Sequence, residues 1–211
     1  LMFLIIGFLQ GLTAGFTVIT AQHFGAGNMK AMRQSVASAC ILSAVVSVIM
    51  TVLSMSMMKQ ILGWMNTPPE IYSEAYGYIM VICAGIVAQV LYNLLASILR
   101  ALGNSKVPLY FLILAAFLNV VLDLVFIIVF HMGAAGAAYA TVISQGVSGA
   151  ACLLYIFKSV PDLHLNKEDW RLHRDLSMWQ LRIGLPMALQ YSITAIGTIM
   201  VQAALNTRGA R

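Results

Sequence analysis

Residues 107–130 decide the fold class, and they read VPLYFLILAAFLNVVLDLVFIIVF. Asp123 is the only charged residue in this segment. The segment is long enough to cross about 30 Å of hydrocarbon as an α-helix. A carboxylate inside a membrane costs about 3 kcal/mol or more unless it is neutralised, hydrated or paired. Membrane proteins that keep such a group commonly use it to bind an ion or a proton, so Asp123 is the first candidate site residue.

The rest of the chain has the same apolar character. Hydrophobic residues make up 61% of it and charged residues only 9%, whereas soluble domains carry roughly 25% charged residues. The apolar residues fall in long blocks and do not alternate with polar ones, as they would in barrel strands. We therefore expect an all-α integral membrane protein with six transmembrane helices, at residues 1–22, 36–58, 71–99, 107–130, 134–157 and 183–205.

The net charge of +5 comes from loops, not from a nucleic-acid-binding face. Most basic residues lie in three alternate loops, and Lys59, Arg208 and Arg211 are the exceptions. Basic loops face the cytoplasm in most membrane proteins. We expect the loops after residues 22, 99 and 158 to be cytoplasmic; their basic residues are Lys30, Arg33, Arg100, Lys106, Lys158, Lys167, Arg171, Arg174 and Arg182.

Polar residues recur at helical spacing along five of the six segments. A spacing of three or four residues places side chains on one face of a helix. Polar groups cannot face lipid without losing hydrogen bonds, so these faces should meet one another or a water-filled cavity. We expect a binding role for Asn119 and Asp123. For the first and last segments we expect ordinary interhelical hydrogen bonds, made by Gln10, Thr13, Thr17, Thr20, Gln190, Thr194, Thr198 and Gln202.

Gly7, Gly11 and Gly15 repeat every fourth residue, which predicts close packing of the first helix against another. The sequence contains no nucleophile–base arrangement, phosphate-binding loop or dinucleotide fingerprint, so it does not indicate an enzyme. No His or Cys has metal-ligand spacing. The three cysteines are interpreted as small residues that face lipid or a neighbouring helix: Cys40, Cys83 and Cys152.

Four short segments, in order along the chain, resemble the multidrug and toxic compound extrusion (MATE) family. They are AQHFGAGN at 21–28, LRALGNS at 99–105, NVVLD at 119–123, and GAAGAA at 133–138 with Thr141 and Gln145 after it. The resemblance covers roughly residues 7–190.

The resemblance implies a twelve-helix transporter with two six-helix lobes around a central cavity. The chain would then be a fragment that carries the second to seventh helices. Residues 1–158 would form an incomplete N-lobe, residues 159–182 a cytoplasmic inter-lobe linker, and residues 183–211 the start of the C-lobe. The complete protein would be a monomer in the cell membrane, in contact with lipid.

The resemblance also implies a function. Family members export cationic and amphipathic compounds in exchange for Na⁺ or H⁺. Asn119 and Asp123 match the cation-binding pair on the family's fifth helix, Thr141 matches a site residue on the sixth, and Asn93 on the fourth matches less closely. The coupling ion is the only inorganic ligand expected, with no other cofactor or metal. The family's partner carboxylate belongs to the first helix, which this chain does not contain.

Two alternatives remain open. The first is a lipid-linked saccharide flippase of the same superfamily, although the six segments carry no internal Lys or Arg of the kind expected in its cavity. The second is a fragment without activity of its own. The transported compound, and the choice between Na⁺ and H⁺, are not encoded in any pattern found in the sequence.

Overall fold

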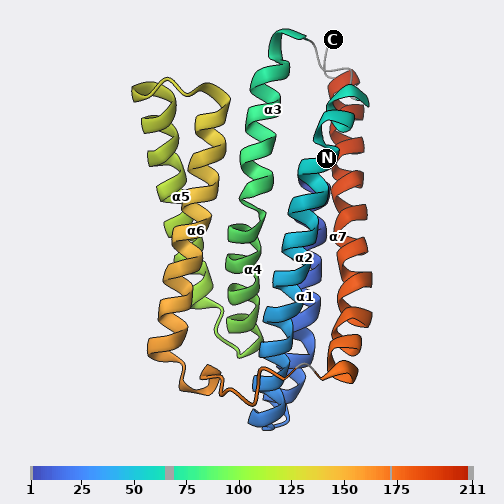
Figure 1. Ribbon diagram of the computed structural model, residues 1–211, viewed down its shortest axis with the longest axis vertical. Helices are drawn as coiled ribbons and strands as arrows, with labels where there is room; N and C mark the ends of the chain where they lie inside the picture. The colour runs from blue at the N-terminus through green and yellow to red at the C-terminus, as the bar shows by residue number, and fades with distance from the viewer. Residues whose placement is uncertain (1, 65–68, 172, 209–211) are drawn as a thin grey trace. The chain divides into compact units, whose positions relative to one another are not determined.

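The computed structural model describes residues 2–64, 69–171 and 173–208, and every regular element in these ranges is a helix (Figure 1). Their order is α1 (Met2–Gly25), α2 (Met29–Trp64), α3 (Pro69–Ala84), α4 (Ile86–Ala101), α5 (Lys106–Leu124), a π-helical turn η1 (Val125–Val129), α6 (Gly133–Ser159), a 3₁₀ turn η2 (Pro161–Leu163) and α7 (Arg174–Arg208).

Four described helices are long and apolar enough to cross a membrane, and a bent pair makes up to five. The spans lie in α1, α2, α5 with η1, and α6, while α3 and α4 form the bent pair. The sixth predicted span, residues 183–205, lies within α7, but its side chains at 199 and 202–205 are outside the described residues. The all-α, multi-pass architecture predicted from the sequence is confirmed.

The chain divides into two compact units. One contains Leu1–Ala39 and Leu165–Arg211, and the other contains Cys40–His164. The first unit therefore joins α1 and the beginning of α2 to α7, although α7 is far away in the sequence. The second holds the rest of α2, then α3 to α6 and the 3₁₀ turn.

In the first unit, α7 packs along α1 (Figure 1). A Cβ atom added to Gly11 would lie 2.6 Å from the Met187 carbonyl oxygen and 2.7 Å from Ala188 Cα, and one added to Gly15 would overlap Gly184. Only glycine allows the two backbones to approach so closely. The close packing predicted from the glycine spacing is confirmed.

In the second unit, the single helix predicted at residues 71–99 is instead bent by 43° between α3 and α4. Gly85 lies at the bend, and the side chain of Val142 in α6 occupies the space that a Cβ at this position would need. Helices commonly kink where glycine lets a neighbouring side chain press on the backbone. The bend thus lies where the backbone at Gly85 contacts the Val142 side chain of α6.

The spans predicted at 107–130 and 134–157 leave only residues 131–133 between them, and this short loop joins α5 and α6 into an antiparallel hairpin. His131 and Gly133 both have left-handed backbone angles, with φ of 52° and 58°. The π-helical turn η1 precedes this loop, and Phe130 N donates to Val125 O at 3.1 Å, five residues earlier. The hairpin brings the polar faces of α5 and α6 together.

Candidate functional site

Asp123 lies in the last turn of α5, immediately before the π-helical turn. Its side chain is half-buried, and its Oδ1 atom is fully buried without a hydrogen-bond partner among the described residues. A buried carboxylate oxygen without a partner has lost its hydration and gained nothing in exchange. Short π-helical segments in α-helices are frequent at functional sites. Both features favour a binding role for this residue.

Asn119 and Thr141 meet across the α5–α6 hairpin. Asn119 Nδ2 donates to Thr141 Oγ1 at 3.3 Å, and Thr141 Oγ1 donates to Ala137 O at 3.0 Å. Asn119 lies one turn before Asp123, so both side chains project from the same side of α5. The structure therefore brings together two of the four predicted site residues and places Asp123 one turn away.

The hydrogen bonds of Asn119 and Thr141 use their side-chain protons and leave their side-chain oxygens able to accept. The Thr141 hydroxyl proton is directed to Ala137 O, and the contact with Asn119 occupies an amide proton, not the amide oxygen. Oxygen lone pairs on both residues remain available. Such oxygens, beside a carboxylate, are the ligands that hard cations prefer.

Asn93 is placed differently. It lies on α4, which packs against both α5 and α6. Its Nδ2 donates to Gln89 O of its own helix at 2.8 Å. Within the part of the chain that the structure describes, no hydrogen bond joins Asn93 to the other three predicted residues.

Gln145 is a polar residue that the site prediction left out. It lies one turn after Thr141 on α6, and its Oε1 atom is buried without a hydrogen-bond partner among the described residues. Its spacing from Thr141 was visible in the sequence, but the burial of its oxygen was not. Asp123 and Gln145 thus provide two unpartnered buried oxygens on the same helical hairpin.

The hydrogen bonds of the threonines in α1 and α7 match the predicted interhelical bonding only in part. Interhelical bonding is confirmed for Thr20, which shares a 2.8 Å hydrogen bond with Ser35 of α2. The prediction is wrong for four other threonines, whose hydroxyls donate to carbonyls three or four residues earlier in their own helices, as threonines in helices often do. These are Thr13, Thr17, Thr194 and Thr198. Gln202 lies outside the residues whose side chains are described.

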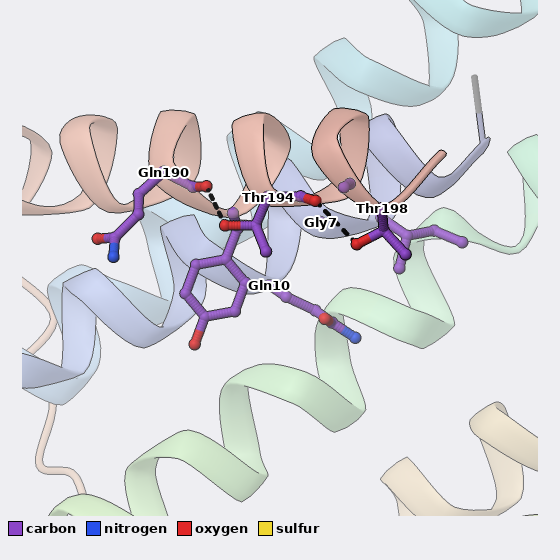
Figure 2. A pocket seen from close by; sticks show the side chains of 8 residues that line it. Gly7, Gln10, Gln190, Thr194 and Thr198 are labelled. Atoms are coloured by element: carbon purple, nitrogen blue, oxygen red, sulfur yellow. Dashed lines mark hydrogen bonds between the residues drawn. The ribbon is translucent and has the colours of Figure 1, made fainter. Parts of the chain in front are cut away.

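A pocket of about 510 Å³ opens between α1 and α7. Figure 2 shows Gln190, Thr194 and Thr198 along one side of α7, with Gln10 coming from α1. The remaining lining residues are Ile6, Gly7, Tyr191 and Ala195, so the described lining contains no charged side chain. The volume is in the range of pockets that bind drug-sized molecules.

The described residues contain no group of three or more His, Cys, Asp or Glu side chains that could hold a metal ion. The oxygens around Asp123 are instead those of one carboxylate and neutral side chains. This composition is compatible with an alkali cation or a proton, the two coupling ions expected in the sequence analysis.

Comparison with known proteins agrees with the helical architecture. The family model MatE matches residues 1–125. The chain is 31% identical to the probable multidrug resistance protein YpnP of Bacillus subtilis (strain 168) over 207 residues, which is 97% of this chain and 46% of that protein. The chain thus spans about half the length of this relative.

Two solved structures are also similar. An inward-facing multidrug resistance MATE transporter of the MOP superfamily superposes with a TM-score of 0.86 and 27% identity, covering 92% of this chain and 44% of that one. A MATE protein in complex with MaD3S superposes with a TM-score of 0.89 and 26% identity, covering 98% of this chain and 47% of that one. With a family model that matches more than half of its length, this multi-pass membrane chain belongs to the MATE family of transporters, which are not enzymes.

Proposed function

We propose that the complete protein is a cation-coupled antiporter that exports cationic or amphipathic compounds across the cell membrane, with Asp123 as the cation-binding carboxylate. The observation that carries the proposal is the buried, unpartnered Oδ1 of Asp123 beside the Asn119–Thr141 contact. Na⁺ or H⁺ is the coupling ion. The protein acts as a monomer.

The coupling follows from the cost of burying charge. An ionised Asp123 is unfavourable in a closed, dry site, whereas a bound cation or proton neutralises it. Asn119 and Thr141 add neutral oxygens, and the amide oxygen of Asn93, on the neighbouring helix α4, is the remaining proposed ligand. Cation binding shifts the protein between conformations only by the difference in its affinity for the two. The site must therefore be better formed in one conformation than in the other.

Under the same proposal, residues 1–158 belong to the N-lobe, 159–182 to the linker and 183–211 to the C-lobe. In the structure, the linker contains the 3₁₀ turn Pro161–Leu163 and the first residues of α7. The loops after residues 22, 99 and 158 face the cytoplasm, in agreement with their basic residues. Asp123, at the opposite end of α5, then lies toward the outside.

The pocket between α1 and α7 is proposed to contribute to compound binding. Amides of Gln10 and Gln190 can hydrogen-bond a polar group, and Tyr191 offers an aromatic face for a cation. An uncharged lining is compatible with transport of chemically varied compounds. It does not favour the flippase alternative, for which basic residues would be expected.

The test is compound export by the full-length protein in liposomes, with the Na⁺ and pH gradients imposed separately. Asp123→Asn keeps the shape of the side chain but removes its charge. We expect it to reduce gradient-driven export at least tenfold. The matched control is Asp162→Asn, which changes an exposed carboxylate in the 3₁₀ turn. Undiminished coupled export by Asp123→Asn would refute the role of this residue.

A further inference from the structure

A buried polar cluster in the first unit joins the start of α7 to α1 and α2. Gln180 is at its centre and is 0% exposed. Its Nε2 donates to Phe16 O at 3.2 Å, to Ser35 O at 2.9 Å and to Ser35 Oγ at 3.2 Å. One side chain of α7 thus bonds to two helices that lie more than a hundred residues earlier in the chain.

Other polar contacts surround this side chain. Ser177, one turn earlier on α7, shares a 2.9 Å hydrogen bond with Ser38 of α2, and both serines are buried. Closer to the linker, Arg33 Nε lies 3.5 Å from Asp169 Oδ2. Asp169 is 4% exposed and also accepts a hydrogen bond from the Asn166 backbone. The cluster therefore extends from the linker into the first turns of α7.

The distance between α1 and α7 increases away from this cluster. A Cβ on Gly15 would overlap Gly184, one on Gly11 would be 2.6 Å from Met187 O, and one on Gly7 would be at an ordinary 3.5 Å from Tyr191 O. The pocket lies at the Gly7 end, where the two backbones are farther apart than at Gly11 or Gly15. The pair is therefore closed at the Gln180 end and open at the other.

The hydrogen bonds at the Gln180 end of the α1–α7 pair are weak enough to break. An interhelical hydrogen bond in a membrane protein contributes only weakly to stability. Gln180 Oε1 is also buried without a hydrogen-bond partner among the described residues. A buried acceptor without a partner raises the free energy of the closed arrangement. The cluster holds the helices together without making their separation prohibitive.

We propose that the Gln180 cluster is a latch that closes the α1–α7 pair on the cytoplasmic side and must open in each transport cycle. The inference rests on the proposed function, which requires alternating access, and on the orientation that places the Gly25 end of α1 in the cytoplasm. Gln180 acts by positioning α7, not by contact with the transported compound.

A reversible cross-link tests the latch. Ser38→Cys and Ser177→Cys are introduced together into the full-length protein, in a background without other cysteines. The two hydroxyls are 2.9 Å apart, so an oxidant should join the new thiols, and mass spectrometry would verify the bond. We expect oxidation to reduce compound export at least tenfold and a reductant to restore it. Each single-cysteine variant, treated with the same oxidant, is the matched control.

The results separate a latch from a static interface. Helices that never part would tolerate the cross-link, so undiminished export by the cross-linked protein would overturn the proposal. Failure of the thiols to join would also overturn it, because the two residues would then not be neighbours. A reduced double variant that exports nothing under any gradient would contradict the proposed function instead, and the latch is then tested by labelling.

For labelling, the single Ser38→Cys variant reports opening, because Ser38 is only 2% exposed in the closed arrangement. Gln180→Leu removes both amide protons that bond to α1 and α2, and we expect a maleimide to react on the order of 10-fold faster with the thiol introduced at position 38. The matched control is Gln34→Leu, the same change one residue before Ser35 and outside the cluster. Equal labelling rates for the two glutamine variants would overturn the latch.

Discussion

Alanine at Gly11 should weaken the α1–α7 interface. The added Cβ would lie 2.6 Å from Met187 O and 2.7 Å from Ala188 Cα, and both atoms are backbone. Carbon atoms pack best at about 3.5–4.0 Å, so α7 would have to move by roughly 1 Å. A side-chain rotation cannot relieve this contact. Overpacking of this kind costs about 1–3 kcal/mol.

Gly7→Ala is the matched control. Its added Cβ would lie at 3.5 Å from Tyr191 O, an ordinary contact. Both substitutions gain the same helix propensity, about 1 kcal/mol, and that gain cancels when the two variants are compared. The difference between them therefore isolates the steric term. We expect the Tm of the detergent-solubilised full-length protein to be a few °C lower for Gly11→Ala than for Gly7→Ala. Equal melting temperatures would show that α1 and α7 are not in close contact at Gly11.

Three further predictions concern the other contacts. Gly85→Ala should lower the Tm because the added Cβ clashes with Val142, and adding Val142→Ala should restore the Tm. If the second substitution does not restore the Tm, packing against Val142 is not the cause of the bend. Thr141→Val removes the hydroxyl that accepts from Asn119, and we expect roughly tenfold weaker coupling-ion affinity in export assays, with unchanged affinity counting against Thr141 as a ligand. Arg33→Met leaves the buried Asp169 without its counter-charge and should lower the free energy of unfolding by about 1–3 kcal/mol. Adding Asp169→Leu to the same protein should reduce this loss. If Arg33→Met alone is as stable as the unsubstituted protein, the ion pair contributes little.

Much of the fold was predictable because membrane helices depend on local composition. A long apolar run must form a helix in lipid, whatever its neighbours are. The glycine spacing on α1 and the short hairpin loop are also local patterns, and both predictions are confirmed. Asn119 and Thr141 were assigned to one site only by the family resemblance, and the hairpin of α5 and α6 brings them into hydrogen-bonding contact.

The bend at Gly85 was not predictable from the same information. Gly77 lies in the same apolar run, and nothing in the sequence separates it from Gly85. In the structure, a Cβ at Gly77 would meet no atom within 4 Å, whereas one at Gly85 would meet Val142. The difference comes from a residue of another helix, so no local pattern reveals it.

Gln180 shows the same limit for polar residues. Its neighbours Trp179 and Arg182 belong to residues 159–182, which the family resemblance implies to be a cytoplasmic inter-lobe linker. It is nevertheless fully buried, because Phe16 and Ser35, separated from it by 164 and 145 positions, accept its amide protons. A polar residue that is buried by distant partners looks the same in sequence as one that faces water.

Asp123 and Gln180 have in common a buried oxygen without a partner, but the consequences differ with charge. For the neutral amide of Gln180 the cost is about 1–3 kcal/mol, which the hydrogen bonds from its two amide protons can largely offset. For an ionised carboxylate the cost is larger, and no described residue donates to Asp123 Oδ1. The amide can therefore be stable as it stands, whereas under the proposed function a bound cation or proton offsets the cost at the carboxylate. This difference is why we assign ligand binding to Asp123 and a mechanical role to Gln180.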